Sequence, residues 1–394
     1  AAYAEVPGVS AGLRDPLQET LRVEAGRLLA VDGDTVLVRA PADGPAGLAA
    51  LDAGSGAVRW SLDPAPPDLA ETEGCVVDEV GGLAVCSAGS PQDAVLHLDL
   101  RDGALVARTP LPGDVVDWDL LDGDLLVAVR EGARLVVVRV TPGLAEGDAP
   151  VPRWRVSVPL GGGGDARPLL LDARDGFVTV SGAVGAVVRA DDGRLLGAWE
   201  PARGYRRVDV LTGPEGFGVW RSPLRGRWFD GDGRPVSDLP GGPVTERVTD
   251  GSAPEVVLTL TPLMTAVDLR TGEALWERGD GGYLQPPALP LRLDGMVVLP
   301  DGDRLLGVDV RTGDVRWSAP APTTTQTLFS RPLTDGRRLV VTDLDEEGAL
   351  VLRAIDLTTG EDAWVVPAPP ASLWVYGVGG RGVMQGGGDV VVLG

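Results

Sequence analysis

One phrase recurs four times with the same internal spacing, and it constrains the fold more than any other feature of this 394-residue chain. In each copy an Asp ends a short apolar run, a Ser-Gly or Thr-Gly pair follows, and a Trp stands eight residues after the Asp. The pairs are Asp52 with Trp60, Asp268 with Trp276, Asp309 with Trp317, and Asp356 with Trp364. Recurrence at fixed spacing identifies a repeat protein, in which each copy is one supersecondary unit.

Each copy of the phrase predicts a β-hairpin. The Asp carboxylate can accept hydrogen bonds from turn amides, and the Gly that follows supplies the positive φ of a tight turn. These glycines are Gly56, Gly272, Gly313 and Gly360. The Trp on the second strand has a large flat ring that is best buried between stacked layers. We therefore expect the Asp to cap the turn and the Trp to be a packing residue.

A second series of turn pairs marks another hairpin in each unit, flanked by apolar β-formers. The pairs are Asp32-Gly33, Gly81-Gly82, Asp122-Gly123, Asp175-Gly176, Glu215-Gly216, Asp250-Gly251, Asp294-Gly295, Asp335-Gly336 and Gly379-Gly380. Each unit thus reads as strands A, B, C and D, with the Trp on strand D. The intervals from Asp268 to Asp309 and from Asp309 to Asp356 are 41 and 47 residues, the length of a four-stranded propeller blade.

The phrase from Val267 to Trp276 resembles the repeat of the PQQ-like, quinoprotein-type β-propellers, a superfamily that includes quinoprotein alcohol dehydrogenases and BamB-like assembly factors. Degenerate copies fill the gaps between the four clear ones: Asp99 with Gly103, the strand around Trp154, Asp191 with Trp199, and the turn at Asp232-Gly233. The resemblance implies an all-β fold with a single propeller domain over residues 1–394, related to the WD40 architecture.

The number of blades follows from counting the turns. Eight C–D hairpins but nine A–B turns are visible, because residues 373–394 form a last blade that lacks its fourth strand. Residues 1–8 offer one, with Tyr3 in the place of the Trp, and such closure would remove exposed sheet edges. We expect nine blades by this count, with the family-typical eight as the alternative.

Charge and composition exclude one class of partner. The formal net charge of −22 opposes binding to nucleic acid and to anionic membranes, which need clustered cations. The chain contains no Lys and no Asn, a bias typical of high-GC actinobacterial coding. No apolar run is long enough to cross a membrane, and the chain begins at Ala1. We expect a trimmed, monomeric protein whose only membrane contact is an anchor outside this sequence.

The two cysteines bear on the compartment. Cys75 and Cys86 flank the Gly81-Gly82 turn almost symmetrically, so strands A and B of one blade should place them face to face. A disulfide there indicates an oxidising, extracytoplasmic compartment. Two reduced core cysteines are the alternative.

The sequence offers little catalytic equipment. His97 is the only histidine, which excludes a multi-histidine metal site, and a chain without Lys cannot form a Schiff base. Quinone-dependent members of the superfamily are expected to pair adjacent cysteines and to hold calcium partly through Asn, whereas these cysteines are eleven apart and Asn is absent. We expect no catalytic residue and no cofactor.

Two stretches are possible binding sites. Asp343, Asp345, Glu346 and Glu347 form the densest acidic group, which suits calcium but also a solvated loop. The stretch from Trp220 to Trp228 is basic and aromatic in an acidic protein, with Arg225 and Arg227 between the tryptophans, which is typical of interfaces. The alternative is that these tryptophans pack against the neighbouring blade.

These observations predict a non-enzymatic, extracytoplasmic propeller that serves as a protein-interaction scaffold, with an unidentified protein partner, or as the ectodomain of an anchored envelope or sensor protein. The alternative is a propeller that binds a small ligand or calcium, or that catalyses a reaction, in its central channel.

Overall fold

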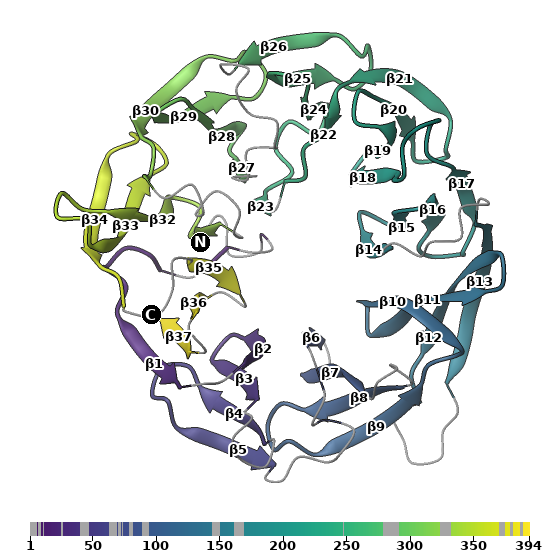
Figure 1. The fold of residues 1–394 in the computed structure, drawn as a ribbon, viewed down its shortest axis with the longest axis horizontal. Coiled ribbons are helices and arrows are strands. Elements are labelled where there is room, and N and C mark those ends of the chain that lie inside the picture. The colour runs from purple at the N-terminus through teal and green to yellow at the C-terminus, as the bar shows by residue number, and fades with distance from the viewer. Residues whose placement is uncertain are drawn as a thin grey trace.

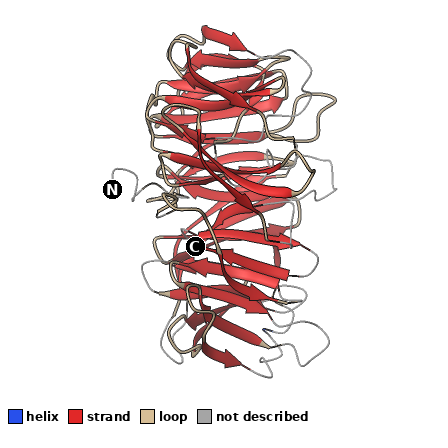
Figure 2. Ribbon diagram, turned by 90° about the vertical axis from the view of Figure 1, so that its left-hand side faces the viewer, coloured by secondary structure: helices blue, strands red, loops and turns tan. Residues whose placement is uncertain are grey.

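In the computed structural model the chain is a ring of nine β-sheets around a central axis (Figure 1). The side view in Figure 2 shows that the ring is a thick disc and that the strands run across its thickness. The structure describes residues 6, 9–10, 12–24, 27–39, 47–62, 69, 72, 74–78, 82–88, 94–143, 150–160, 169–246, 248–278, 291–323, 332–369, 375–378, 381–386 and 389–394. The nine-blade count from the sequence is confirmed.

Each blade is a meander of antiparallel strands whose first strand lies nearest the axis. Blade 1 is β2 (Arg27–Asp32), β3 (Thr35–Arg39), β4 (Leu48–Asp52) and β5 (Val58–Leu62); blade 2 is β6 (Cys75–Asp78), β7 (Leu83–Ala88), β8 (Ala94–Asp99) and β9 (Leu105–Pro110); blade 3 is β10 (Asp114–Leu121), β11 (Asp124–Glu131), β12 (Arg134–Thr141) and β13 (Val151–Pro159).

The next three blades repeat this order. Blade 4 is β14 (Leu170–Arg174), β15 (Phe177–Ser181), β16 (Gly185–Arg189) and β17 (Leu195–Trp199); blade 5 is β18 (Asp209–Gly213), β19 (Gly216–Ser222), β20 (Arg225–Asp230) and β21 (Pro235–Pro240); blade 6 is β22 (Gly242–Pro243), β24 (Val256–Leu260), β25 (Met264–Asp268) and β26 (Ala274–Arg278).

The last three blades include one extra strand. Blade 7 is β27 (Leu291–Leu293), β28 (Met296–Asp301), β29 (Arg304–Asp309) and β30 (Val315–Pro320), with β23 (Val248–Thr249) added in parallel at its inner edge; blade 8 is β31 (Leu333–Thr334), β32 (Arg338–Leu344), β33 (Leu350–Asp356) and β34 (Asp362–Pro367); blade 9 is β35 (Val375–Val378), β36 (Arg381–Gly386), β37 (Asp389–Leu393) and β1 (Glu19–Val23).

The ring closes where β1 pairs antiparallel with β37 as the outer strand of blade 9. The closing strand therefore comes from the N-terminal part of the chain, as expected, but it is residues 19–23 rather than residues 1–8. Most of residues 1–8, including Tyr3, lies outside the described residues. Leu21 explains this choice of strand, because its side chain is buried with Val390 and Val392 in the core between blades 9 and 1.

Three of the predicted turn pairs, Asp122-Gly123, Asp175-Gly176 and Asp294-Gly295, form two-residue hairpins between paired strands. The prediction at Asp250-Gly251 is wrong, because this pair follows β23, which pairs in parallel with β27, and blade 6 continues instead from β22 to β24. Gly379-Gly380 lies outside the described residues. Asp122 and Gly123 have φ of 52° and 78°, and Asp294 and Gly295 have φ of 53° and 65°. Positive φ at both central residues matches the right-handed twist of the flanking strands. The repeat Asp also acts as expected: the Oδ1 atom of Asp309 accepts hydrogen bonds from the backbone N–H groups of Arg311 and Thr312, each at 3.0 Å.

The repeat tryptophans connect neighbouring blades. Trp60 in blade 1 is 8% exposed, and its Nε1 donates to the carbonyl of Leu100, next to the turn of blade 2, at 2.9 Å. Gly103 in that turn has φ of 74°, and a Cβ there would lie 2.6 Å from the Trp60 ring. The turn thus needs Gly for its backbone and for close approach of the ring.

The same carbonyl position is used at most other blade junctions. In each pair the side chain of the first residue donates to the backbone carbonyl of the second: Trp154 to Ala190, Trp276 to Val310, Trp317 to Leu357, Ser237 to Leu269, and Thr20 to Ala53. Ser237 and Thr20 thus replace an indole by a hydroxyl. Blade 4 departs from the expected pairing of Asp191 with Trp199: Arg189 is at the Asp position and Gly197 at the Trp position, and the Trp199 ring covers Gly197 from two residues on.

Candidate functional site

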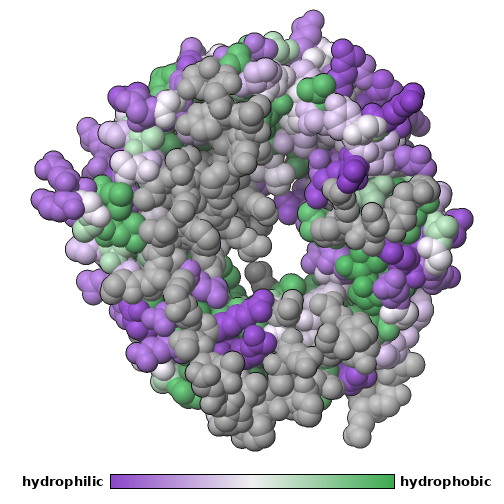
Figure 3. All heavy atoms as spheres, in the orientation of Figure 1, coloured by the Kyte–Doolittle hydropathy of each residue, from purple (hydrophilic) through white to green (hydrophobic). Residues whose placement is uncertain are grey.

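A cavity of about 660 Å³ lies among the inner strands of blades 4 to 9. The space-filling view shows that the ring is open at its centre (Figure 3). The charged and hydroxyl-bearing residues that line the cavity are Arg174, Asp175, Thr212, Glu246, Thr249, Ser252 and Arg292. A cavity of this volume is in the range of small-molecule sites.

The most buried charges of this cavity neutralise each other. The Arg292 side chain is 5% exposed and its Nε donates to Glu246 Oε1 at 2.9 Å. Arg292 Nη1 also donates to the carbonyls of Ser252 and Ala253 at 3.3 and 2.8 Å. Burial raises the pKa of Glu246, and Arg292 opposes this rise. The guanidinium is thus already bound by the protein, as a buried pair must be.

Three acidic side chains come from the neighbouring inner strands β10 and β14. Asp117 Oδ2 accepts a hydrogen bond from the backbone N–H of Leu171 at 2.8 Å, which joins blades 3 and 4. Burial raises the pKa of Asp119 to about 6, helped by the nearby charges of Asp172 and Asp117. Asp172 is ion-paired with Arg174 at 2.8 Å. Raised carboxyl pKa values occur at functional sites but also at structural acids, as here.

The acidic stretch that the sequence singled out does not form one group. Asp343 is 8% exposed and accepts hydrogen bonds from Thr323 and, at 2.8 Å, from Arg353 Nη1. Asp345 caps a turn by accepting the backbone N–H groups of Glu347 and Ala349, and Glu346 and Glu347 are exposed. Among the described residues, no cluster of three or more His, Cys, Asp or Glu side chains has the geometry of a metal site.

His97 is a core residue of β8. It is 2% exposed, and its Nε2 is 3.2 Å from the Thr109 hydroxyl. Burial lowers the pKa of His97 to about 4, so the ring is neutral at pH 7. The structure places no Ser or Cys nucleophile in hydrogen-bonding contact with this ring among the described contacts.

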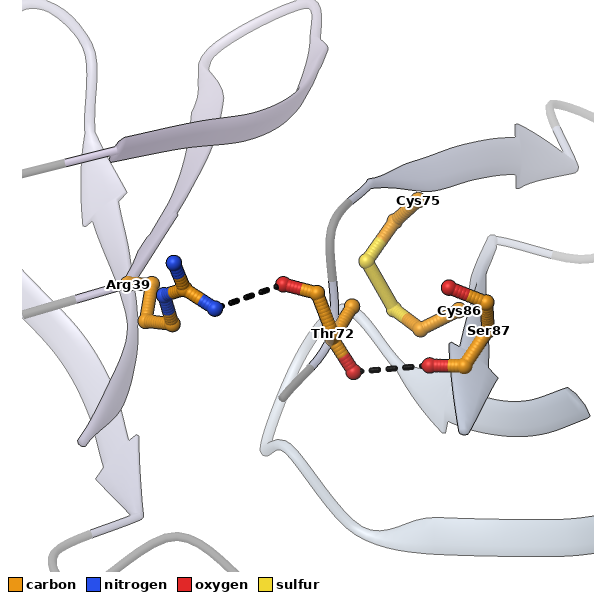
Figure 4. The surroundings of a disulfide bond; sticks show 5 residues. All are labelled: Arg39, Thr72, Cys75, Cys86 and Ser87. Atoms are coloured by element: carbon orange, nitrogen blue, oxygen red, sulfur yellow. Dashed lines mark hydrogen bonds between the residues drawn. A yellow bond between two sulfur atoms is a disulfide. The ribbon is translucent and has the colours of Figure 1, made fainter. Parts of the chain in front are cut away.

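Cys75 and Cys86 form a disulfide between β6 and β7, as predicted. They are direct partners in the strand register, with Cα atoms 4.1 Å apart. Figure 4 shows that Thr72 lies beside them, donating to the carbonyl of Ser87 at 2.8 Å and accepting from Arg39 of blade 1 at 2.9 Å. Cys86 is fully buried in the core between blades 1 and 2, so the disulfide is a structural element.

The predicted contact stretch divides into core and surface. Trp220 and Trp228 are 1% and 4% exposed and pack between blades 5 and 6, which matches the packing alternative. Arg225 and Arg227 are exposed and, with Arg221 and Leu224, line a groove of about 560 Å³. Apolar side chains line its inner part: Trp199, Val219, Phe229, Leu239 and Pro240. We call this the blade-5 groove.

A second basic segment beside the groove was missed in the sequence. The connection from β17 to β18 exposes Arg203, Tyr205, Arg206 and Arg207. It is held against the groove because the Ala202 N–H donates to the Arg221 carbonyl, and Arg221 Nε to the Glu200 carbonyl, at 2.9 and 2.7 Å. The signal was three arginines within five residues of a strongly acidic chain.

Comparison with known proteins agrees with this architecture. A family model described as outer membrane protein assembly factor BamB matches residues 14–219, 153–328 and 261–394. The crystal structure of BamB from Moraxella catarrhalis covers 96% of this chain and 99% of its own, with 15% identity and a TM-score of 0.49. Saccharomyces cerevisiae Sqt1 covers 95% and 98%, with 10% identity and a TM-score of 0.50.

One curated relative is a protein kinase. The serine/threonine-protein kinase AfsK of Streptomyces griseus is 30% identical over 167 residues, which are 40% of this chain. The match spans 20% of the kinase's length.

Within the described residues, the structure contains no helix long and apolar enough to cross a membrane.

Proposed function

Because the chain belongs to the family of the outer membrane protein assembly factor BamB, we propose that it is a non-enzymatic scaffold that binds a partner protein outside the cytoplasm. The observation that carries this proposal is the blade-5 groove, where exposed arginines surround apolar side chains on a rigid, closed ring. Arg and aromatic residues are the types enriched at protein interfaces.

The residues do not fit a quinone cofactor. The disulfide joins cysteines of two paired strands, and Cys86 is enclosed in a blade core rather than facing the channel. The chain has no Asn to complete the calcium site that the superfamily resemblance implies. The single His is buried and bound to Thr109. These features support a role without catalysis. The fold that the chain shares with quinone-dependent enzymes does not by itself argue for catalysis.

The disulfide supports an extracytoplasmic location, because such bonds persist in oxidising compartments. The match to part of a protein kinase supports the sensor version of the proposal, in which a propeller of this kind is the binding part of a longer signalling protein. In either version the groove would recognise a protein segment and the ring would hold it rigidly.

A small-ligand role is the second candidate, favoured by the central cavity of about 660 Å³. Arg292 and Glu246 would then have to exchange their mutual contacts for contacts to the ligand.

Site-specific photocross-linking in the native cells tests the scaffold proposal. A photoreactive residue at position 224, in the groove, should give one discrete cross-linked protein, whereas one at exposed Val58 of blade 1 should not. The absence of a protein adduct from position 224 and from other exposed positions around the ring, together with a small molecule that co-purifies stoichiometrically, would overturn it in favour of the cavity.

A further inference from the structure

We propose that the blade-5 groove binds a short acidic peptide segment of the partner protein, with one bulky apolar side chain in the groove and flanking carboxylates on the arginines. The inference rests on the proposed scaffold function and specifies the chemistry of the segment that the scaffold recognises.

Charge is the first argument. Six arginines gather at the groove and the adjoining connection, whereas the whole chain carries −22. They are Arg203, Arg206, Arg207, Arg221, Arg225 and Arg227, and the acids among them are Glu200, Asp209 and Asp238. Figure 3 shows strongly hydrophilic side chains gathered over blade 5. This local excess of positive charge would attract carboxylates to one place on an otherwise acidic protein.

Four of the six arginines are available to a ligand, whereas Arg207 pairs with Asp209 and Arg221 donates to the Glu200 carbonyl. Arg203, Arg206 and Arg225 are exposed and make no ion pair within the described part of the chain. Arg227 pairs with Asp238 at 2.7 Å, but the two side chains are 54% and 77% exposed. Such a solvated pair contributes little, so a peptide carboxylate can replace Asp238 without a large loss.

Apolar surface is the second argument. Leu224 is 66% exposed between β19 and β20 and lines the groove. Trp199 and Phe229 lie behind it with ring centroids 5.3 Å apart and form part of the groove lining. An apolar pocket with arginines around it suits an aromatic or leucine side chain flanked by acids.

The groove favours a peptide over the other polyanions. Nucleic acid presents phosphates along its whole length, and the acidic surface beyond blade 5 would repel them. An anionic membrane would meet the same repulsion across the face of the ring. The carboxylates of a short segment lie within a Debye length, about 8 Å, of the arginines. Salt screens their repulsion by the more distant negative charges of the ring.

Fluorescence anisotropy with the full chain tests this directly. The probe is a fluorescein-labelled eight-residue peptide with one Phe between Glu and Asp residues; a second peptide replaces Phe by Ala, and a third replaces the acids by Gln. We expect only the first to bind well, with affinity that falls as NaCl rises. Arg225→Glu and Leu224→Asp should each weaken binding about tenfold or more.

Arg101→Glu is the matched control, because Arg101 is also exposed and without an ion pair among the described residues but lies in blade 2. It should bind the peptide as the unmodified chain does, and circular dichroism should show that all three variants are folded. If Arg225→Glu lowers the melting temperature, Arg225→Ala takes its place. Equal weakening by Arg225→Glu and Arg101→Glu would overturn the inference.

Two further outcomes also overturn it. One is that no peptide binds; the other is that an oligonucleotide or phosphatidylserine vesicle binds better than the peptide with the same dependence on Arg225. The two proposals fail separately: a protein cross-linked only at another surface would leave the scaffold function standing while removing this groove from its mechanism.

Discussion

The Nε1 atom of Trp364 donates a hydrogen bond to the carbonyl of Leu13 at 3.0 Å, across 351 positions of sequence. In other blades this indole binds the carbonyl beside a C–D turn of the next blade. Blade 9 has no such turn, because its third and fourth strands come from opposite ends of the sequence. Leu13, itself 2% exposed, supplies the missing acceptor and core side chain.

Removing residues 1–23 should therefore open the ring. The loss of buried Leu13, Leu17 and Leu21, at about 1.5–3 kcal/mol each, should lower the free energy of unfolding by roughly 5 kcal/mol and leave the β37 edge unpaired. Urea unfolding and light scattering measure both effects. A chain that starts at residue 9 is the control, and similar self-association of the two truncated chains would contradict the closure described here.

Gly360 and Gly348 separate backbone strain from contact with the tryptophan. Both have positive φ, 75° and 81°, but only a Cβ at Gly360 would meet Trp317, at 2.8 Å. Gly348→Ala should cost about 1–2 kcal/mol for its backbone, and Gly360→Ala should cost a further 1–3 kcal/mol, roughly, for the displaced ring. Thermal unfolding of the two variants should differ accordingly; equal costs would mean that the ring adjusts freely.

Stability should depend on pH through Asp119. Burial raises its pKa from the ordinary 3.8 to about 6, so the stability that it contributes is complete only below pH 3.8 and is lost as the pH rises through 6. Asp119→Asn should be more stable than the unmodified chain at pH 7.5, by up to about 2 kcal/mol, and equally stable at about pH 3. Urea titrations at the two pH values measure this. The exposed Glu346→Gln is the control, and a gain that is the same at both pH values would exclude this cause.

Reduction of the Cys75–Cys86 disulfide should lower the free energy of unfolding by about 2–3 kcal/mol, because it closes a loop of 11 residues in the unfolded chain. Melting temperatures with and without a phosphine reductant measure the loss. The double variant Cys75→Ala with Cys86→Ala should melt at one temperature in both conditions. Two free thiols in protein isolated from its native compartment would contradict an oxidised state there.

Asp343 should behave as the partner of Arg353 and not as a calcium ligand. Burial opposes ionisation, but hydrogen bonds from Thr323, Leu344 and Arg353 lower the pKa of Asp343 overall. Asp343→Asn should cost about 3 kcal/mol by leaving Arg353 with one anionic partner fewer. The loss should be the same in EDTA and in millimolar calcium, with Asp345→Asn as the control. A calcium-dependent loss would restore the metal interpretation.

The candidate binding region was only partly visible in the sequence. The stretch from Trp220 to Trp228 drew attention to blade 5, but residue types alone could not separate the buried tryptophans from the exposed Arg225 and Arg227. Arg203 and Arg206 joined the region only because the chain folds back beside Arg221. Surface composition is a property of neighbours in space, which spacing along the chain does not report.

The sequence by itself determined the local hairpins. The Asp, Gly and Trp spacing dictates turn geometry and strand register, and the turn between Cys75 and Cys86 brings the disulfide partners together. These interactions span few residues, so the pattern of side chains is sufficient to predict them. The repeat count gave nine blades for the same reason.

Only the tertiary structure decided which segment closes the ring, where Trp199 packs and which charges are buried. Residues 19–23 pair with β37 because Leu21 matches the core between blades 9 and 1, and Arg292 meets Glu246, 46 positions away in the sequence, only once the inner strands surround the cavity. Each of these outcomes depends on complementary surfaces that meet only after folding. Packing and desolvation, which act between residues distant in sequence, therefore selected them.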